Sequence, residues 1–284
     1  MATDLDKLLS FLIVEEIGED VFRGTSPPRP RRVFGGQVAA QSLDAATRTV
    51  DKDRLAHAMH AYFLRPGDPA KDIQFEVERR RDGRSFTTRD VVARQDGVAI
   101  FNTSISFHIH EEGLEHNADM PDVPGPEGLE ADHARWARLA EKYPDRFDPP
   151  LRQPIERRPV DPRDFLNNEI RKPQQNIWFR AIGDLGEDPR RHQILLTFMS
   201  DFGLLGTTLM PHPHHGFDKD MQSASLDHAL WFHQPFRADE YLLYSLDSPV
   251  GAGGRGFARG SFYSQDGRLV ASTAQECLIR VRKD

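Results

Sequence analysis

The stretch that decides the fold is Gln95-Asp96-Gly97-Val98-Ala99-Ile100-Phe101-Asn102-Thr103, because the chain repeats its pattern as Gln265-Asp266-Gly267-Arg268-Leu269-Val270-Ala271-Ser272-Thr273. Both copies place an Asp-Gly pair before an apolar run and end on a Thr. Asp-Gly between two β-rich segments is a strong signal for a β-hairpin. Self-similarity of this kind predicts two copies of one structural unit.

The repeat extends beyond this hairpin. Upstream, residues 61–66 (AYFLRP) resemble residues 230–235 (LWFHQP). Each of these segments is followed by a stretch suited to a strand, at residues 73–78 and 241–246. One similar hairpin can arise by chance, but a series of features in the same order is typical of a duplicated unit.

Each copy also carries one candidate helix before its strands. Residues 36–50 have the Ala-rich spacing of a buried helix, and residues 192–209 place their apolar side chains on one broad arc. Pro211 and Pro213 then end the second helix, because proline cannot continue the helical hydrogen bonds. A long helix followed by antiparallel strands is an α+β unit in which the sheet can wrap around the helix.

The segment between the two copies differs in composition. Residues 111–126 are acidic and contain Pro and Gly, which is typical of a linker. Residues 131–143 have the apolar spacing of a short helix. We therefore expect a first unit at residues 1–110, a linker region at 111–150 and a second unit at 151–284.

Composition restricts the class of protein. The 284 residues suffice for about two domains, and 38% of them are hydrophobic, which is enough for a sizeable core. The net charge of −7 gives no basic footprint for nucleic acid. A single cysteine excludes an internal disulfide framework and favours a reducing compartment. The first residues lack a signal-peptide pattern, and no apolar run approaches the ~18 residues of a membrane helix. We therefore expect a cytoplasmic protein with neither a nucleic-acid nor a membrane partner.

In the order of its motifs, the chain resembles the acyl-CoA thioesterase II family, the TesB type. The motifs that carry the resemblance are residues 33–38 (VFGGQV), 60–67 (HAYFLRPG), 81–86 (RDGRSF), 199–202 (MSDF), 224–228 (ASLDH), 231–233 (WFH), 235–236 (PF), 255–257 (RGF) and 270–276 (VASTAQE). No single motif is decisive, but the ordered set is specific. The resemblance implies an α+β protein of two fused hotdog domains, each an antiparallel sheet wrapped around a long helix. It also implies that neither a metal nor an organic cofactor is needed.

The resemblance further implies a catalytic trio of Asp, Ser or Thr, and Gln, which together hold the attacking water. By motif these residues map to Asp201, Ser225 and Gln275. The family often has Thr where Ser225 stands, and the hydroxyl group is kept. Position alone leaves other interpretations open. Asp201 could reach solvent or cap a turn within its helix, Ser225 could be a hydroxyl at the start of an apolar strand, and Gln275 could face outward from the last strand.

The chemistry of a thioester fits this set of side chains. A thioester is already activated, so an enzyme must supply an oriented water, a base for its proton and donors for the developing oxyanion. Gly35 and Gly36 precede the first helix, where backbone N–H groups can approach a substrate carbonyl, although simple helix entry explains them equally well. We expect hydrolysis of fatty acyl-CoA, with medium to long acyl chains, by direct attack of water without a covalent intermediate.

Two other candidate groups lie close to the trio in sequence. Asp227 and His228 look like a catalytic dyad, but adjacent residues of a strand point to opposite faces, so we expect one of them to be structural. Cys277 shares strand parity with Gln275 and can face the same site. It lacks an evident partner that would stabilise a thiolate, which favours a buried and inert thiol.

A third group is a loop rich in histidine. His212, His214 and His215 lie near Asp218 and Asp220, and this combination could ligate a metal ion. The surrounding prolines favour a loop with solvent-exposed histidines instead, and we expect no metal.

Two rival functions and one asymmetry remain to be tested. A hotdog enoyl-CoA hydratase and an acyl-CoA-binding module without turnover are the alternatives, because a fold hosts several functions. Hotdog domains usually pair, and the fusion supplies one pair internally, so a homo-oligomer of such chains is expected.

The position equivalent to Ser225 in the first copy is near Ala56, and that of Gln275 is Ile105. Neither can orient a water, which predicts one functional site per chain.

Overall fold

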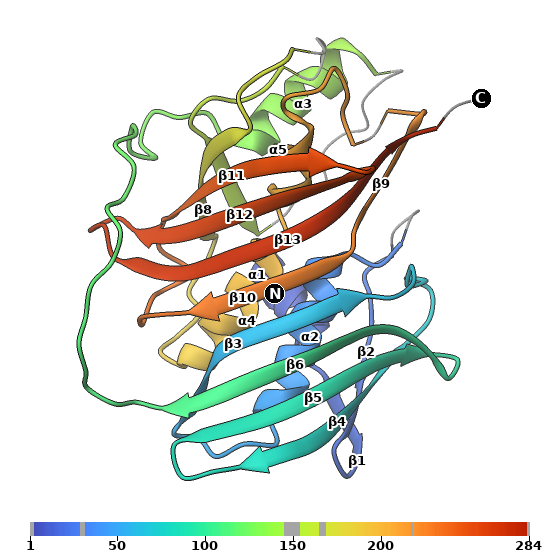
Figure 1. Cartoon of the computed structure of the whole chain (residues 1–284), viewed down its shortest axis with the longest axis vertical. Helices are drawn as coiled ribbons and strands as arrows, with labels where there is room; N and C mark the ends of the chain where they lie inside the picture. The colour runs from blue at the N-terminus through green and yellow to red at the C-terminus, as the bar shows by residue number, and fades with distance from the viewer. Residues whose placement is uncertain (1–2, 29–31, 145–153, 165–168, 217, 283–284) are drawn as a thin grey trace.

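In the computed structural model, residues 3–28, 32–144, 154–164, 169–216 and 218–282 are described, and their strands form one antiparallel sheet (Figure 1). The first half comprises α1 (Asp4–Leu12), β1 (Glu15–Gly18), β2 (Val21–Gly24), α2 (Gly35–Thr47), β3 (Arg54–Phe63), β4 (Ile73–Asp82), β5 (Phe86–Gln95) and β6 (Val98–Ile109). The second half comprises α3 (Asp132–Lys142), β7 (Ile155–Pro159), β8 (Gln174–Ala181), α4 (Pro189–Ser200), α5 (Leu204–Leu209), β9 (Met221–Ser225), β10 (Asp227–Phe232), β11 (Leu242–Ala252), β12 (Arg255–Ser264) and β13 (Leu269–Val281).

The sheet runs without a break through both halves of the chain. Its strand order is β1-β2-β4-β5-β6-β3-β10-β13-β12-β11-β8-β7, and β9 pairs with β13 beside this path. In Figure 1 the blue and green strands of the first half therefore lie directly against the orange and red strands of the second half at β3 and β10. The predicted α+β class, with an antiparallel sheet around a helix in each half, is confirmed.

The pairing of β3 with β10 reveals the symmetry of the repeat. His60 pairs with Ala229, and on either side of this pair Tyr62 lies opposite Asp227 while Ala58 lies opposite Trp231. The sequence repeat aligns Tyr62 with Trp231, so a two-fold rotation about the central pair exchanges the two copies. The duplicated units thus associate in the way that two subunits of a symmetric dimer would.

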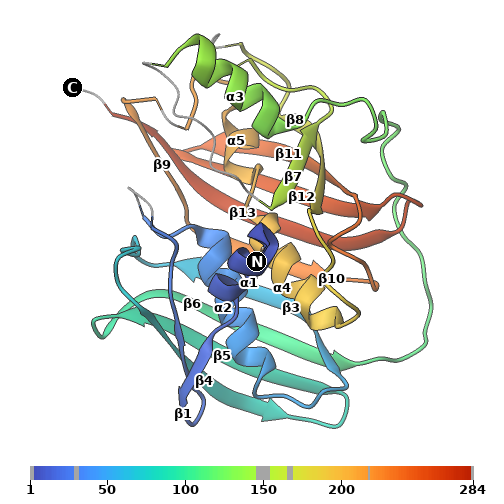
Figure 2. The ribbon, with the colours of Figure 1, turned by 180° about the vertical axis from the view of Figure 1, so that it is seen from behind.

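The helices fill the concave side of the sheet. All residues of α2 from Gly36 to Thr47 are buried, as are those of α4 from His192 to Ser200. Helix α2 packs on β3 to β6 on one side and on α4 on the other, and Figure 2 shows both helices in front of the sheet. The many Ala residues of α2 permit this close approach, because small side chains let helices and strands come near one another.

The second long helix is not continuous, which corrects the expectation of one helix over residues 192–209. Helix α4 begins earlier, with Asp188 as N-cap, and ends at Ser200. Helix α5 then starts at Leu204 after a break in which Gly203 adopts a φ of 93°. This left-handed conformation is strained for residues other than glycine, so Gly203 allows the chain to turn sharply here.

The two Asp-Gly hairpins are both present but differ in geometry. Asp96 and Gly97 both have positive φ, at 49° and 77°, and they join β5 to β6 as a two-residue turn. In the second hairpin only Gly267 has positive φ, and the Ser264 N–H bonds to the Arg268 carbonyl across a longer loop. The same Gln-Asp-Gly sequence therefore adopts two different turn conformations in the two copies.

The predicted short helix at residues 131–143 is α3, Asp132–Lys142. Among the described residues, no helix has both the length and the apolar character needed to span a membrane.

Candidate active site

Asp201 is the C-cap residue of α4, placed where the helix breaks before α5. This corrects the expectation that it lies within a continuous helix. The N-terminus of α2 meets this point from the other half of the chain, and the Gly36 N–H donates to Asp201 Oδ2 at 2.9 Å. The ring of Phe34 stacks on that of Phe202 with a centroid distance of 4.7 Å and closes the junction. The carboxylate thus lies at the positive end of a helix dipole, which favours its ionised form.

Ser225 and Gln275 converge on the same carboxylate. Ser225 Oγ donates to Asp201 Oδ1 at 3.3 Å, and Gln275 Nε2 donates to Ser225 Oγ at 2.9 Å. Asp201 and Ser225 are half-buried, whereas the Gln275 side chain is fully buried. Ser225 is the last residue of β9, so the expectation that it begins a strand is wrong, while Gln275 lies in the last strand, β13, as expected.

His228 is a member of this network that the sequence analysis did not place there. Its Nδ1 lies 2.7 Å from Gln275 Oε1, and its Nε2 lies 2.8 Å from Ser200 Oγ, with the ring only 1% exposed. The neighbouring Asp227 points to the other face and accepts a hydrogen bond from the Glu276 N–H at 2.6 Å. The two residues therefore form no dyad. The signal that could have identified His228 is its inward position on an alternating strand.

Burial raises the pKa of the Asp201 carboxyl above its ordinary value, because desolvation disfavours the charged form. The charge of His228 and the hydrogen bonds from Gly36 and Ser225 act in the opposite direction and lower the pKa. The net shift is upward, which makes the ionised carboxylate a stronger base.

The glycine pair at the start of α2 is required by the closeness of its neighbours. A Cβ atom on Gly35 would lie 2.7 Å from Asp201 Oδ2, and one on Gly36 would lie 2.4 Å from the Phe198 carbonyl oxygen. The Gly36 N–H is engaged by Asp201 and is therefore not free for a substrate carbonyl. Of the two amides expected to contact substrate, only that of Gly35 keeps this possibility.

Cys277 faces the same site as Gln275, as their strand parity predicts. Its Sγ accepts a hydrogen bond from Gln275 Nε2 at 3.3 Å, and it pairs across the sheet with Ser225. Burial raises the pKa of the Cys277 thiol to about 12. The thiol is therefore neutral near pH 7 and a poor nucleophile.

The histidine-rich loop is only partly as expected. His212 is exposed and His214 half-buried, but His215 is buried, which corrects the expectation of solvent-exposed histidines. Within the described part of the chain, His214, Asp218 and Asp220 place one ligand atom each within 4.8 Å of one another. Asp218 Oδ2 already accepts the His215 N–H at 2.8 Å, so this carboxylate also serves the conformation of its own loop.

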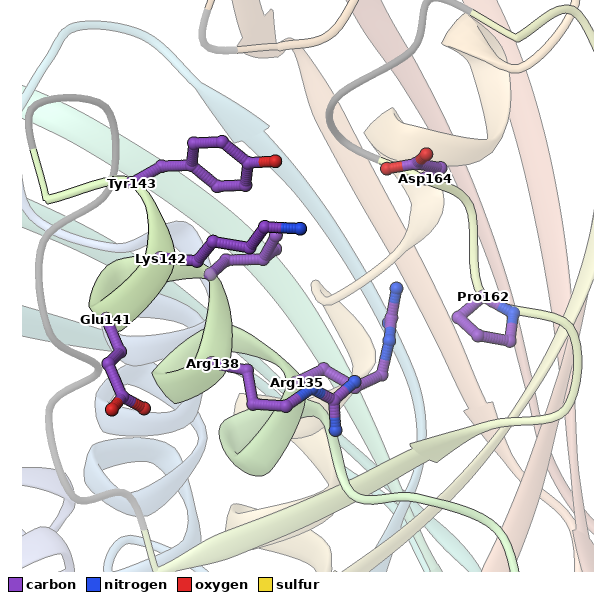
Figure 3. Close-up of a pocket in the computed structure, with 8 residues that line it drawn as sticks. Arg135, Arg138, Glu141, Lys142, Tyr143, Pro162 and Asp164 are labelled. Atoms are coloured by element: carbon purple, nitrogen blue, oxygen red, sulfur yellow. The ribbon is translucent and has the colours of Figure 1, made fainter.

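Two cavities bear on where a substrate could bind. The larger, of about 710 Å³, lies along α3, and Figure 3 shows Arg135, Arg138 and Lys142 projecting into it from the helix. None of its lining residues belongs to the polar network around Asp201. The smaller, of about 200 Å³, is lined by Phe202 and Gly203, the residues that directly follow Asp201, together with other apolar side chains and several charged ones.

Known protein families match both halves of the chain. Residues 24–108 match the family described as acyl-CoA thioesterase N-terminal domain, and residues 150–278 match the family described as acyl-CoA thioesterase. The chain is 38% identical to acyl-CoA thioesterase 2 of Haemophilus influenzae over 99% of both chains. It is 39% identical to human acyl-coenzyme A thioesterase 8 over 95% of this chain and 88% of that protein. Acyl-CoA thioesterase II TesB2 from Mycobacterium marinum superposes with a TM-score of 0.80 at 38% identity, covering 97% of this chain and 99% of that chain.

Proposed function

The chain belongs to the acyl-CoA thioesterase family and is a thioester hydrolase, and from this premise we propose that Asp201, Ser225 and Gln275 carry its reaction. The single observation that supports this assignment is their convergence. Three polar side chains from α4, β9 and β13 meet in one hydrogen-bonded group, and the only carboxylate among them has a raised pKa. A carboxyl with a perturbed pKa and specific hydrogen-bond partners is a typical catalytic group.

The proposed reaction is the direct attack of water on the thioester. Asp201 removes a proton from the water while the water oxygen forms a bond to the carbonyl carbon. Ser225 and Gln275 hold that water, and the Gly35 amide is the candidate donor to the oxyanion. The tetrahedral intermediate then breaks its C–S bond, and the CoA sulfur leaves with the proton that Asp201 had taken. No acyl group becomes attached to the protein.

Apolar surfaces at the site favour fatty acyl groups of medium to long chain. A Cβ on Gly35 would touch the ring of Phe63 at 2.8 Å, so this aromatic side chain lies beside the carboxylate of Asp201. Phe34 and Phe202 stack beside it and are partly exposed. Ile177, Phe179 and Leu209 extend this apolar surface into the cavity at Phe202.

The two rival functions find less support. A hydratase would need an Asp and a His converging on one substrate carbon, but Asp227 accepts the Glu276 N–H whereas the neighbouring His228 contacts Gln275 and Ser200. A binding module without turnover would not need a carboxylate with a raised pKa at the thioester. We propose further that the enzyme is cytoplasmic, that it forms a homo-oligomer and that its domains divide at residues 1–110, 111–150 and 151–284.

A thiol-release assay tests the proposal. Acyl-CoA substrates from acetyl to long chain are supplied to the purified protein, and free CoA is followed with a thiol reagent. We expect release of one thiol per acyl group, rising from acetyl to medium or long chains, with free fatty acid as the other product. Tight binding of acyl-CoA without thiol release would instead identify a binding module.

A further inference from the structure

The network around Asp201 contains two groups whose hydrogen positions determine its function. The Gln275 amide can present either its N–H₂ or its carbonyl oxygen to Ser225, and the His228 ring can carry its proton on either nitrogen. The heavy-atom distances along the chain of contacts are 2.8 Å from Ser200 to His228, 2.7 Å from His228 to Gln275 and 2.9 Å from Gln275 to Ser225. Each is short enough that one atom must donate and the other accept.

Counting protons from Asp201 outward fixes these positions. An ionised carboxylate can only accept, so its Oδ2 takes the Gly36 N–H and its Oδ1 takes the single proton of Ser225. The Ser225 oxygen must then accept from Gln275, which places the amide nitrogen toward Ser225 and the amide oxygen toward His228. The reversed amide would bring two acceptors face to face at 2.9 Å.

We propose that His228 is a positioning residue that holds the Gln275 amide in its working orientation through a proton on Nδ1. Only an N–H at that atom can satisfy the Gln275 oxygen 2.7 Å away. The other ring nitrogen fits either charge state of the ring. In a neutral ring Nε2 accepts a hydrogen bond from the Ser200 hydroxyl. In an imidazolium Nε2 donates to Ser200 Oγ, and the Ser200 hydroxyl then donates to the Thr197 carbonyl at 2.8 Å.

The result is a chain of donors that all point toward Asp201. Such chains strengthen one another by polarisation, and this one lies mostly in the protein interior, where it is not screened by water. Without the Nδ1 proton the Gln275 amide can turn its carbonyl oxygen toward Ser225. The Ser225 hydroxyl would then lose its donor, and both its hydrogen bond to Asp201 and the orientation of the water would be weakened. This inference rests on the proposed role of Gln275 in orienting that water.

Two substitutions of His228 separate positioning from packing. His228→Asn can place an amide N–H close to where Nδ1–H lies, whereas His228→Leu has a similar bulk without any donor. We expect His228→Leu to lower kcat roughly 10–100-fold with KM within about twofold, a loss typical of groups that orient reacting side chains. His228→Asn should recover most of this loss. His233→Leu is the matched control, because His233 lies just beyond the same strand and its exposed side chain has Ser272 as its only hydrogen-bond partner among the described residues.

Equal loss of activity in the Asn and Leu variants, or loss through KM alone, would overturn the positioning role. A variant that fails to fold does not end the test, because the wild-type protein can be examined directly. In protein uniformly labelled with ¹³C and ¹⁵N, the ring nitrogens of His228 are assigned at mildly alkaline pH through correlations to its own backbone, so that no variant is needed. A protonated Nδ1, alone or together with Nε2, is expected.

A ring protonated only on Nε2 would refute the proposal whatever the kinetics show. This outcome is also distinct from failure of the proposed function. A protein that binds acyl-CoA without hydrolysing it could still carry the Nδ1 proton, and an active hydrolase could lack it.

Discussion

Asp201, the proposed catalytic base, illustrates how such a residue costs stability. Its carboxyl has a raised pKa in the folded protein, so folding favours the protonated form. The stabilisation from this group is fully present below the pKa of the unfolded chain and is lost as the pH rises through the raised pKa. In its ionised form the carboxylate therefore opposes folding, and the hydrogen bonds from Gly36 and Ser225 offset only part of that cost.

Asp201→Asn should consequently lower kcat about 10²–10⁴-fold, the usual contribution of general base catalysis. The variant should fold, and its melting temperature should be equal to or above that of the wild type, since the buried charge is gone. Steady-state kinetics with a medium-chain acyl-CoA and a thermal melt at neutral pH measure both quantities. Near-normal turnover in the folded variant would remove Asp201 from the mechanism.

The pH dependence of turnover follows from the same carboxyl. Because the base must be ionised, kcat should fall tenfold per pH unit below the pKa of Asp201. That limb should lie above the 3.8 of an ordinary Asp, since burial raises the pKa. A pH–rate profile of kcat under saturating substrate measures it. A profile that stays flat down to pH 4 would show that no carboxyl with a raised pKa acts as the base.

Cys277 provides the test of a covalent route. Its thiol is neutral at physiological pH because burial raises the pKa to about 12, so Cys277→Ser should leave kcat at the same order of magnitude. Mass spectrometry of the enzyme quenched during turnover should find no acyl adduct. An acyl group on Cys277 or Ser225 would contradict direct attack by water.

At this scale the sequence predicts residue types better than their connections. The trio Asp201, Ser225 and Gln275 could be chosen because their motifs occur in a specific order. The sequence argues against a dyad of Asp227 and His228, but it does not place His228 beside Gln275, because it does not reveal which partner lies across from a strand residue. The engagement of the Gly36 amide by Asp201 was also not predictable, because that contact joins the two halves of the chain.

At the scale of elements, the site depends on the junction of two helix ends. The N-terminus of α2 meets the C-terminus of α4, and the glycine pair lets the backbones approach. The sequence predicted both helices, but it placed α4 and α5 in one continuous segment because the apolar spacing runs through the break. The single Gly203 was insufficient as a signal, since isolated glycines also occur within helices.

Gly36→Ala tests this junction. The added Cβ would lie 2.4 Å from the Phe198 carbonyl oxygen, which is backbone and cannot move aside easily. We expect a loss of about 1–3 kcal/mol in the free energy of unfolding, as for other overpacked sites, together with a fall in kcat. Urea denaturation and the thiol-release assay measure the two effects.

Gly206→Ala in α5 is the matched control for that substitution. A Cβ there meets nothing within 4 Å, so the variant should gain about 0.4–1 kcal/mol through the lower entropy of its unfolded chain. Similar stability of the two variants would show that the helix junction is less tightly packed than the distances imply.

At the scale of the whole molecule, the two-fold repeat creates two equivalent candidate sites, but only one of them carries the polar side chains of the trio. Where α2 begins with Gly35 and Gly36, α4 begins with Pro189 and Arg190. At the second of these candidate sites, at the start of α4, the Arg190 guanidinium donates to the carbonyls of Asp51 at 2.5 Å and Arg54 at 3.2 Å. These contacts engage the side chain at the start of α4, and Arg190 also lines a cavity of about 490 Å³ beside it.

The polar side chains are likewise confined to one copy. Ala56 stands near the position equivalent to Ser225, and its carbonyl accepts a hydrogen bond from the buried Gln193 amide at 2.7 Å. Ile105 stands at the position of Gln275 and is fully buried in the core. The sequence alone suggested this asymmetry through residue types, but the side chains of Arg190 and Gln193 that fill the space could be recognised only once α4 was placed against α2.

We therefore expect one functional site per chain. A non-hydrolysable acyl-CoA analogue titrated by calorimetry should saturate at one equivalent per chain, because Ala56 and Ile105 stand where the second copy has Ser225 and Gln275. The double variant Asp201→Asn with Gln275→Ala serves as the kinetic control. Its residual activity should be no higher than that of Asp201→Asn alone. Two equal equivalents in the titration, or turnover that survives in the double variant, would mean that the first copy contains a second working site built from other residues.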